Sequence, residues 1–254
     1  YSLRNASQAF AALGMEEMSL WAAHYAAHLS LHGLGDAQKA VEGARVVTAS
    51  ARRAGFTLIE FVAGMLEAEG LMSGMDDGSN PVNDDRLEDA RQRWSWVSSR
   101  AETLGYPAEH VRALYQEGRA LQWLNRMDEA IARYEAALAA SGSVTDVELL
   151  NEIRTTAAAA YESEGRTAGA IELLAGLTTD IAAGETSAEQ ELARNLYEKG
   201  RLLNSTWRYA AAMADLQHSI EIQVADPESP PWGLAGLELG KAQYALGDPD
   251  AAET

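Results

Sequence analysis

A pattern of small and large apolar positions returns along the second half of the chain and predicts pairs of antiparallel helices. In each copy, a small residue lies in a first helix, a turn follows, and an alanine comes twelve positions after the small residue, ahead of an aromatic residue or leucine. Apolar positions at this spacing share one helix face, so the pattern predicts an all-α fold. The clearest copy is LYQEGRALQWLNRMDEAIARYEAAL, with marks at Gly118, Leu121, Leu124, Ala130, Tyr134 and Ala137.

The pattern keeps its register in three further copies. Small residues of the first helices lie at positions 118, 158, 200 and 240, at spacings of 40, 42 and 40. A fixed period of this length is the signature of a repeat array. The marks of the further copies are Ala158, Tyr161, Gly165, Ala170, Leu174 and Leu177, then Gly200, Leu203, Trp207, Ala212, Leu216 and Ser219, then Gly240, Leu246, Gly247 and Ala252. Weaker upstream copies carry Leu34, Gly35, Ala40, Val47, Ala90, Trp94 and Val97.

Turn-forming segments divide the copies into helix pairs within one repeat domain over residues 1–254. The polar segment MDDGSNPVNDD predicts a loop inside one pair, with Asp84 or Asp85 as the N-cap of the following helix. Because the chain opens on Tyr1 and stops just after Ala252, we expect a fragment of a larger protein. The expected pairs span 18–53, 56–105, 107–142, 147–183 and 187–226, with an incomplete pair at 231–254.

From about residue 107 onward, these marks resemble the tetratricopeptide repeat. Small residues let two antiparallel helices approach closely, while the aromatic residue or leucine fills the gap between one pair and the next. The resemblance implies a right-handed superhelical array, an α-solenoid, whose concave inner wall comes mainly from the first helix of each pair. Glu117 and Lys199 depart from the family pattern, because both lie where the family usually packs a leucine.

Composition and charge narrow the function. The absence of cysteine excludes disulfides, thiolate chemistry and cysteine-ligated zinc. No apolar run reaches the roughly 18 residues that span a bilayer, and no export signal opens the chain. A formal charge of −18 repels nucleic acid. We therefore expect a cytoplasmic protein, of a bacterium by its preference for arginine over lysine, that needs no cofactor and binds neither membranes nor nucleic acid.

Two matched trios of arginine and tyrosine mark the expected binding surface, each at spacings i, i+3 and i+7 on one helix face. The family resemblance places them in the concave groove, where arginine forks and tyrosine hydroxyls suit an acidic segment or a C-terminal carboxylate. The alternative is that these arginines pair with neighbouring glutamates such as Glu152 and Glu162. The expected binding residues are Arg112, Tyr115, Arg119, Gln122, Trp123, Arg194, Tyr197, Arg201, Asn204, Lys241 and Tyr244.

Two segments contain residue types that can bind a metal ion. His24, His28 and His32 recur every four residues on one helix face, a spacing that can hold a metal. A hydrolytic zinc helix needs HExxH, whereas this segment reads HYAAH, so we expect solvated or interface histidines and no metal. The acidic loop lacks the spacing of a calcium site, so we expect a solvated connection. Its candidate residues are Asp76, Asp77, Asn80, Asp84 and Asp85.

No catalytic motif stands out. The chain shows neither a Ser-His-acid set nor a glycine-rich phosphate loop nor paired carboxylates in an apolar run, and repeat arrays seldom enclose a dry pocket, so we predict no enzymatic activity. We expect a recognition module that binds a peptide or protein in the concave groove, as the sensor or scaffold part of a larger signalling protein. The alternatives are a metabolite sensor domain of a transcription activator and a structural or oligomerisation scaffold.

Overall fold

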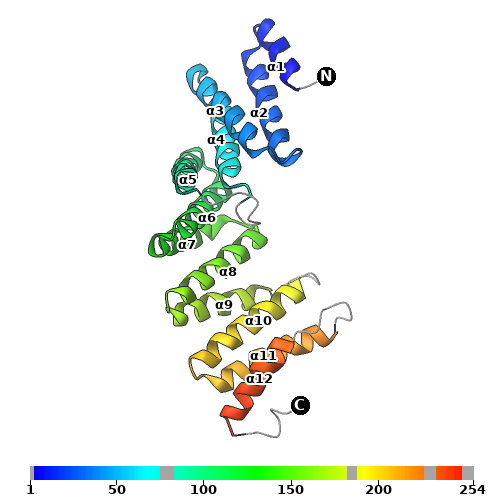
Figure 1. Cartoon of the computed structure of the whole chain (residues 1–254), viewed down its shortest axis with the longest axis vertical. Helices are drawn as coiled ribbons and strands as arrows, with labels where there is room; N and C mark the ends of the chain where they lie inside the picture. The colour runs from blue at the N-terminus through cyan, green and yellow to red at the C-terminus, as the bar shows by residue number, and fades with distance from the viewer. Residues whose placement is uncertain (1–2, 75–82, 182–187, 226–232, 248–254) are drawn as a thin grey trace. The chain divides into compact units, whose positions relative to one another are not determined.

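The computed structural model describes residues 3–74, 83–181, 188–225 and 233–247. Within these ranges the chain is helical and has no strand, so the all-α prediction is confirmed. None of the described helices is long and apolar enough to cross a membrane. The elements labelled in Figure 1 are α1 (Leu3–Ala12), α2 (Glu16–His32), α3 (Ala37–Ala54), α4 (Thr57–Met72), α5 (Asp84–Leu104), α6 (Pro107–Trp123), α7 (Met127–Ala140), α8 (Val147–Ser163), α9 (Thr167–Ile181), α10 (Ala188–Ser205), α11 (Tyr209–Ala225) and α12 (Gly233–Ala245), with a short 3-10 helix at Ser141–Ser143.

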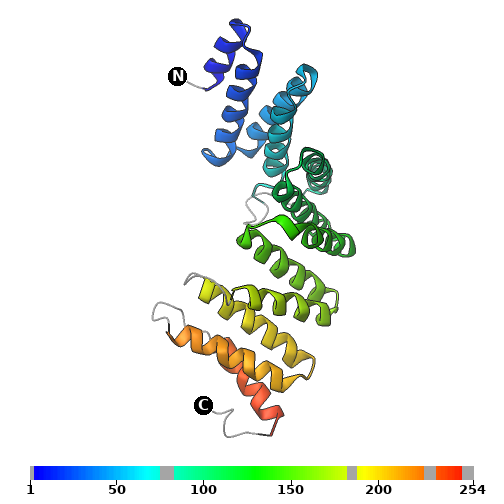
Figure 2. The same cartoon turned by 180° about the vertical axis from the view of Figure 1, so that it is seen from behind.

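The chain divides into two compact units, Tyr1–Asp146 and Val147–Thr254. In the first unit α2 packs on α3, α4 on α5 and α6 on α7, and each pair also contacts the next. In the second unit α8 packs on α9 and α10 on α11, while α12 contacts α10 and α11. Figure 1 and the reverse view in Figure 2 show the two helices of a pair running side by side in opposite directions.

One helix was not expected from the repeat pattern. α1 packs on α2, ahead of the first predicted pair. None of its residues is buried, so it contributes no buried position of the kind on which the repeat pattern rests.

The start of α5 is set by a side-chain N-cap. α5 begins after Asn83, whose side-chain oxygen accepts a hydrogen bond from the Arg86 backbone N–H at 3.2 Å. The prediction of Asp84 or Asp85 as N-cap is therefore wrong. Both residues lie in the first turn of α5, where a negative charge interacts favourably with the helix dipole.

Trp207 adopts a φ of 66° in the turn between α10 and α11. That left-handed conformation is rare for a bulky side chain.

The small residues of the repeat leave space for a large side chain of the neighbouring helix. A methyl group at Gly200 on α10 would lie 2.6 Å from Cγ of Leu216, which is fully buried on α11. In the same way, a methyl group at Gly118 on α6 would overlap the ring of Tyr134 on α7. In both cases the large residue belongs to the same pair as the glycine, so it fills space inside the pair rather than only between pairs.

Buried carboxylates bridge successive second helices in the first unit. Glu67 on α4 is 2% exposed, and it binds Arg45 of α3 at 2.8 Å and Arg93 of α5 at 2.6 Å. Glu60, also on α4, binds Arg52 of α3 and Arg100 of α5. Each carboxylate thus receives one arginine from its own pair and one from the preceding pair, which compensates part of the cost of burying its charge.

The same arrangement explains one departure from the family pattern. Glu117 is fully buried on α6, and its carboxylate lies 3.4 Å from Arg91 of α5 and from Arg133 of α7. Burial raises the pKa of Glu117 above its ordinary value, and the two arginines only partly oppose that rise. In the second unit the signs are exchanged, because Lys199 on α10 pairs with Asp215 on α11 at 3.0 Å. An ion pair therefore occupies the position where a leucine was expected.

Candidate partner-binding surface

The first predicted trio lies on α6, and its members differ in exposure. Arg112 is exposed, and its guanidinium lies 3.5 Å from the carboxylate of Asp146. Tyr115 is only 2% exposed, and its ring packs against that of Tyr134 with centroids 5.9 Å apart. The structure therefore places Tyr115 between α6 and α7, where its ring is covered and offers a partner almost no surface.

The half-buried Arg119 joins the end of α6 into one cluster. Its guanidinium carbon lies 5.0 Å from the centroid of Trp123 and 5.9 Å from that of Tyr115, at cation–π distances. The indole of Trp123 packs partly buried on a core cluster of the first unit. The Gln122 side-chain oxygen accepts a 2.7 Å hydrogen bond from the hydroxyl of Tyr134. Arg119 and Trp123 therefore form one ordered surface, whereas the side-chain oxygen of Gln122 is occupied by a hydrogen bond within the helix pair.

The second trio lies on α10 and is largely engaged within its own unit. Both terminal nitrogens of Arg201 donate to the Glu162 carboxylate of α8 at 2.8 Å, and Glu198 also binds this guanidinium. The hydrogen bonds from Arg201 hold the pKa of Glu162 below its ordinary value. Tyr197 is buried, and Arg194 is exposed. For Arg201, the structure favours the alternative in which arginine pairs with a neighbouring glutamate.

The two predicted polar residues Asn204 and Lys241 meet on one glutamate. The Asn204 amide nitrogen donates to the backbone oxygen and the carboxylate of Glu238 on α12, at 2.9 and 3.0 Å. The ammonium of Lys241 lies 2.6 Å from the same carboxylate. Burial raises the pKa of Glu238, but these hydrogen bonds bring it below its ordinary value. Tyr244, one turn further along α12, is 71% exposed.

Apart from Tyr244, the exposed apolar side chains on first helices were not among the predicted binding residues. On α12, Leu234, Leu237 and Tyr244 are all exposed and follow the spacing i, i+3 and i+10, so they form one stripe with Lys241. In the first unit, Tyr25 on α2 and Leu58 on α4 are exposed as well. The signal was available for α12, since helical spacing aligns Leu234 and Leu237 with the predicted residues Lys241 and Tyr244.

The histidine stripe lies on α2 with unequal environments. His24 is 7% exposed, and burial followed by the nearby His28 lowers its pKa to about 4. The ring of His28 lies 4.4 Å from that of His32, and His32 also lies 3.4 Å from Glu69 of α4. Within the described residues, no three histidine or acidic side chains are grouped to hold a metal ion. Of the acidic loop, Asp76, Asp77 and Asn80 lie outside the described residues.

No protein-family model matches the sequence, and no curated protein matches it. Solved structures do match, among them a putative kinesin light chain with TPR-like repeats from Podosopora anserina. It shares 18% identity and a TM-score of 0.62 over 83% of this chain and 97% of that one.

Two further matching structures are of proteins whose names describe them as sensors or as containing a sensor. The Signal Transduction ATPase with Numerous Domains (STAND) protein with a tetratricopeptide repeat sensor from Pyrococcus horikoshii gives a TM-score of 0.69 at 12% identity, over 99% of this chain and 40% of that one. The quorum sensor NprR from B. thuringiensis gives 0.55 at 14% identity, over 93% and 62%. Likeness at such identities shows the fold. The chain has the fold of the tetratricopeptide-like helical repeat proteins.

Proposed function

We propose that this chain is a protein-recognition module whose first helices bind a peptide or protein partner. The observation that carries the proposal is where the large apolar side chains are exposed. Among the described helices of the pairs, exposed large apolar residues lie mostly on first helices, whereas the second helices expose only Val46 and Val224. Those on first helices are Met18, Tyr25, Leu29, Leu58, Val147, Leu234, Leu237 and Tyr244.

The stripe on α12 is the best candidate in the second unit. Leu234, Leu237 and Tyr244 lie on one helix face, so a partner would cover them together. Fully burying a leucine side chain contributes about 2 kcal/mol, and tyrosine is among the residues that dominate binding energy at interfaces. Lys241 lies within the stripe and is exposed. Because the ammonium of Lys241 already pairs with Glu238, the stripe suits a partner segment that binds mainly through apolar anchors, with an acidic residue beside them.

The first unit offers a separate face on α2 and α4. The exposed ring of Tyr25 stacks on Trp21 with centroids 6.0 Å apart, so it is already ordered before any partner binds. Ordering an aromatic ring in advance lowers the entropic cost of association. On α6, the cluster of Arg119 with Trp123 adds an aromatic and cationic surface in the same unit.

The proposed biological setting is the sensor or scaffold part of a signalling protein. Two solved structures that share the fold are named as sensors, which supports a sensor role here without fixing the ligand. The engagement of Arg201 by Glu162 argues for apolar anchors as the main source of affinity, with an acidic residue or a C-terminal carboxylate as a secondary feature of the partner.

Affinity capture with paired variants tests the proposal. The chain is immobilised and exposed to lysate of the source organism, and bound proteins are quantified by mass spectrometry. Leu237→Ser with Tyr244→Ala removes the stripe of the second unit, and Tyr25→Ala with Leu58→Ser removes the face of the first. Val224→Ser, on the second helix α11, is the matched control because Val224 is 79% exposed.

We expect a partner that binds the native chain and the control but is lost from at least one double variant. All four proteins should keep the same helix content, since exposed side chains are changed. Capture that is equal for every variant contradicts the proposal. A metabolite that raises the melting temperature, with no protein captured, would instead support the metabolite-sensor alternative.

A further inference from the structure

The spaces between neighbouring second helices of the first unit share one design. Between α3 and α5, the arginines Arg45 and Arg93 meet on the buried carboxylate of Glu67. Between α5 and α7, Arg91 and Arg133 meet on Glu117. In both places, a carboxylate on the intervening first helix holds two cations that reach across from the outer helices.

The space between α1 and α3 over α2 departs from this design. It is an open pocket of about 660 Å³, and its floor is made of small side chains. The floor residues are Ala23, Ala26, Ala27, Ser30 and Gly43. Small side chains let the backbone of a docked helix approach closely and receive its bulky residues, as ridges fit into grooves. We call this pocket the α1–α3 groove.

Apolar side chains form the walls of the α1–α3 groove. Leu3 on α1, Leu29 on α2, Leu34 after α2 and Val46 on α3 all line it, and all four are exposed. Large apolar residues that cluster around one depression in a soluble protein mark an interaction surface more often than residues scattered singly. The groove therefore has an apolar lining with nothing in the described structure to cover it.

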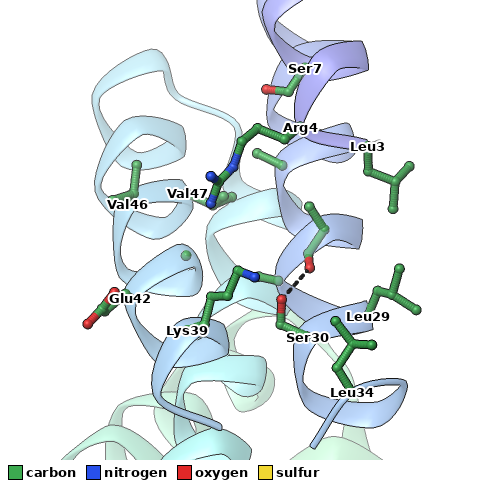
Figure 3. Close-up of a pocket in the computed structure, with 14 residues that line it drawn as sticks. Leu3, Arg4, Ser7, Leu29, Ser30, Leu34, Lys39, Glu42, Val46 and Val47 are labelled. Atoms are coloured by element: carbon green, nitrogen blue, oxygen red, sulfur yellow. Dashed lines mark hydrogen bonds between the residues drawn. The ribbon is translucent and has the colours of Figure 1, made fainter. Parts of the chain in front are cut away.

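Two cations also line the groove. Figure 3 shows the guanidinium of Arg4 and the ammonium of Lys39 directed into the space between the helices, whereas Glu42, which also lines the pocket, turns its carboxylate away from that space. Glu42 accepts a hydrogen bond from Gln38 at 3.1 Å. Among the described residues, neither Arg4 nor Lys39 forms an ion pair. On a chain with a net charge of −18, a pair of uncompensated cations at an apolar groove is a local positive site.

We propose that the α1–α3 groove receives an amphipathic acidic helix from a partner protein. Bulky apolar residues of that helix pack on the small floor, and its carboxylate binds between Arg4 and Lys39. This carboxylate takes the place that Glu67 takes between Arg45 and Arg93 within the chain itself. Helices that dock into grooves place apolar anchors at i, i+3, i+4 and i+7, which fits a lining of aliphatic walls. The groove shares Leu29 with the first-helix residues named above, but it contains none of the residues that the two double variants change.

A displayed library of helical peptides about 16 residues long, a length of more than four turns, tests the inference. The library is selected on the whole chain and counter-selected on Ala26→Leu, in which an added side chain fills the floor. Affinities of enriched peptides are then measured by fluorescence anisotropy on the native chain, on Arg4→Glu with Lys39→Glu, and on Leu237→Ser with Tyr244→Ala as the control for the first-helix face.

We expect enriched peptides with apolar residues at helical spacing and with Asp or Glu between them. Charge reversal at Arg4 and Lys39 should weaken their binding by about tenfold or more, and peptides with Lys in place of the acids should regain it. The Leu237→Ser with Tyr244→Ala control should bind them as the native chain does, so failure here is separable from failure of the proposed function.

Three results would overturn the inference. They are enrichment of basic or uncharged peptides, equal affinity for the native and charge-reversed chains, and no enrichment beyond that on Ala26→Leu. A concentration-dependent dimer in sedimentation, abolished by the charge reversal, would also overturn it, because a second copy of the chain would then be the occupant.

Discussion

The close approach of paired helices can be tested with two glycines of the second unit. Gly200 and Gly176 both lie inside helices, on α10 and α9, and alanine is favoured over glycine in a helix interior by about 1 kcal/mol. Their surroundings differ. A methyl group at Gly176 would meet no atom within 4 Å, whereas one at Gly200 would lie 2.6 Å from Cγ and 2.8 Å from Cδ2 of the buried Leu216.

The two alanine variants should therefore change stability in opposite directions. Gly176→Ala should raise the free energy of unfolding by about 1 kcal/mol, which is the helix preference alone. Gly200→Ala gains the same preference but overpacks the contact with Leu216, at a cost of about 1–3 kcal/mol, so its net effect is destabilising by up to about 2 kcal/mol. Gly118→Ala should behave like Gly200→Ala, because its methyl group meets the buried ring of Tyr134.

Urea unfolding followed by far-UV circular dichroism measures these differences, with the three variants and the native chain under identical conditions. Equal stabilisation by Gly176→Ala and Gly200→Ala would refute the reasoning, because the Gly200 position would then not require a small residue. Destabilisation by both variants would also contradict it, since nothing in the structure opposes a methyl group at Gly176.

Further predictions concern charge. Because the pKa of His24 is lowered to about 4, the free energy of unfolding should fall as pH drops from 6.5 toward 4, by about 2 kcal/mol between pH 7 and pH 5. Urea unfolding at pH 7 and pH 5 should show a loss that is about 2 kcal/mol smaller in His24→Leu than in the native chain. An equal loss in the two proteins would contradict this prediction. Glu67→Ala leaves Arg93 without its buried partner and should lower the free energy of unfolding by about 3 kcal/mol in the same assay. A decrease of less than about 1 kcal/mol would contradict the stabilising role of this ion pair. Arg201→Ala should alter stability by less than about 1 kcal/mol but raise the pKa of Glu162 in an NMR titration, and a static pKa would be inconsistent with the pairing.

The helix pairs were predictable because their signal is local and repeated. Gly118 and Ala130 lie twelve residues apart, and the same spacing joins Gly200 and Ala212. Such marks reflect close packing within one pair, and that packing depends on residues near in sequence. α1 escaped prediction because it buries no residue and so carries no comparable mark.

The candidate site was less predictable because its chemistry depends on residues far apart in sequence. Helical spacing identified the faces of α6 and α10, but it did not reveal that the Tyr115 ring is covered by α7. The partner of Arg201 is Glu162, 39 residues away on α8. The carboxylate of Glu67 likewise meets Arg45, 22 residues earlier. Pairings of this kind follow from how helix pairs stack, which the sequence pattern alone does not specify.

Site-specific photo-crosslinking tests the central claim, recognition by first helices, most directly. A benzophenone amino acid replaces Tyr25 on α2, Tyr244 on α12 or, as the matched control on a second helix, Val224 on α11, and adducts formed in cells of the source organism are identified by mass spectrometry. All three side chains are more than half exposed, so each probe can reach a partner. Our account predicts one partner protein crosslinked from Tyr25 or Tyr244 and absent from Val224. The same adducts from all three positions, or adducts from Val224 alone, would contradict it.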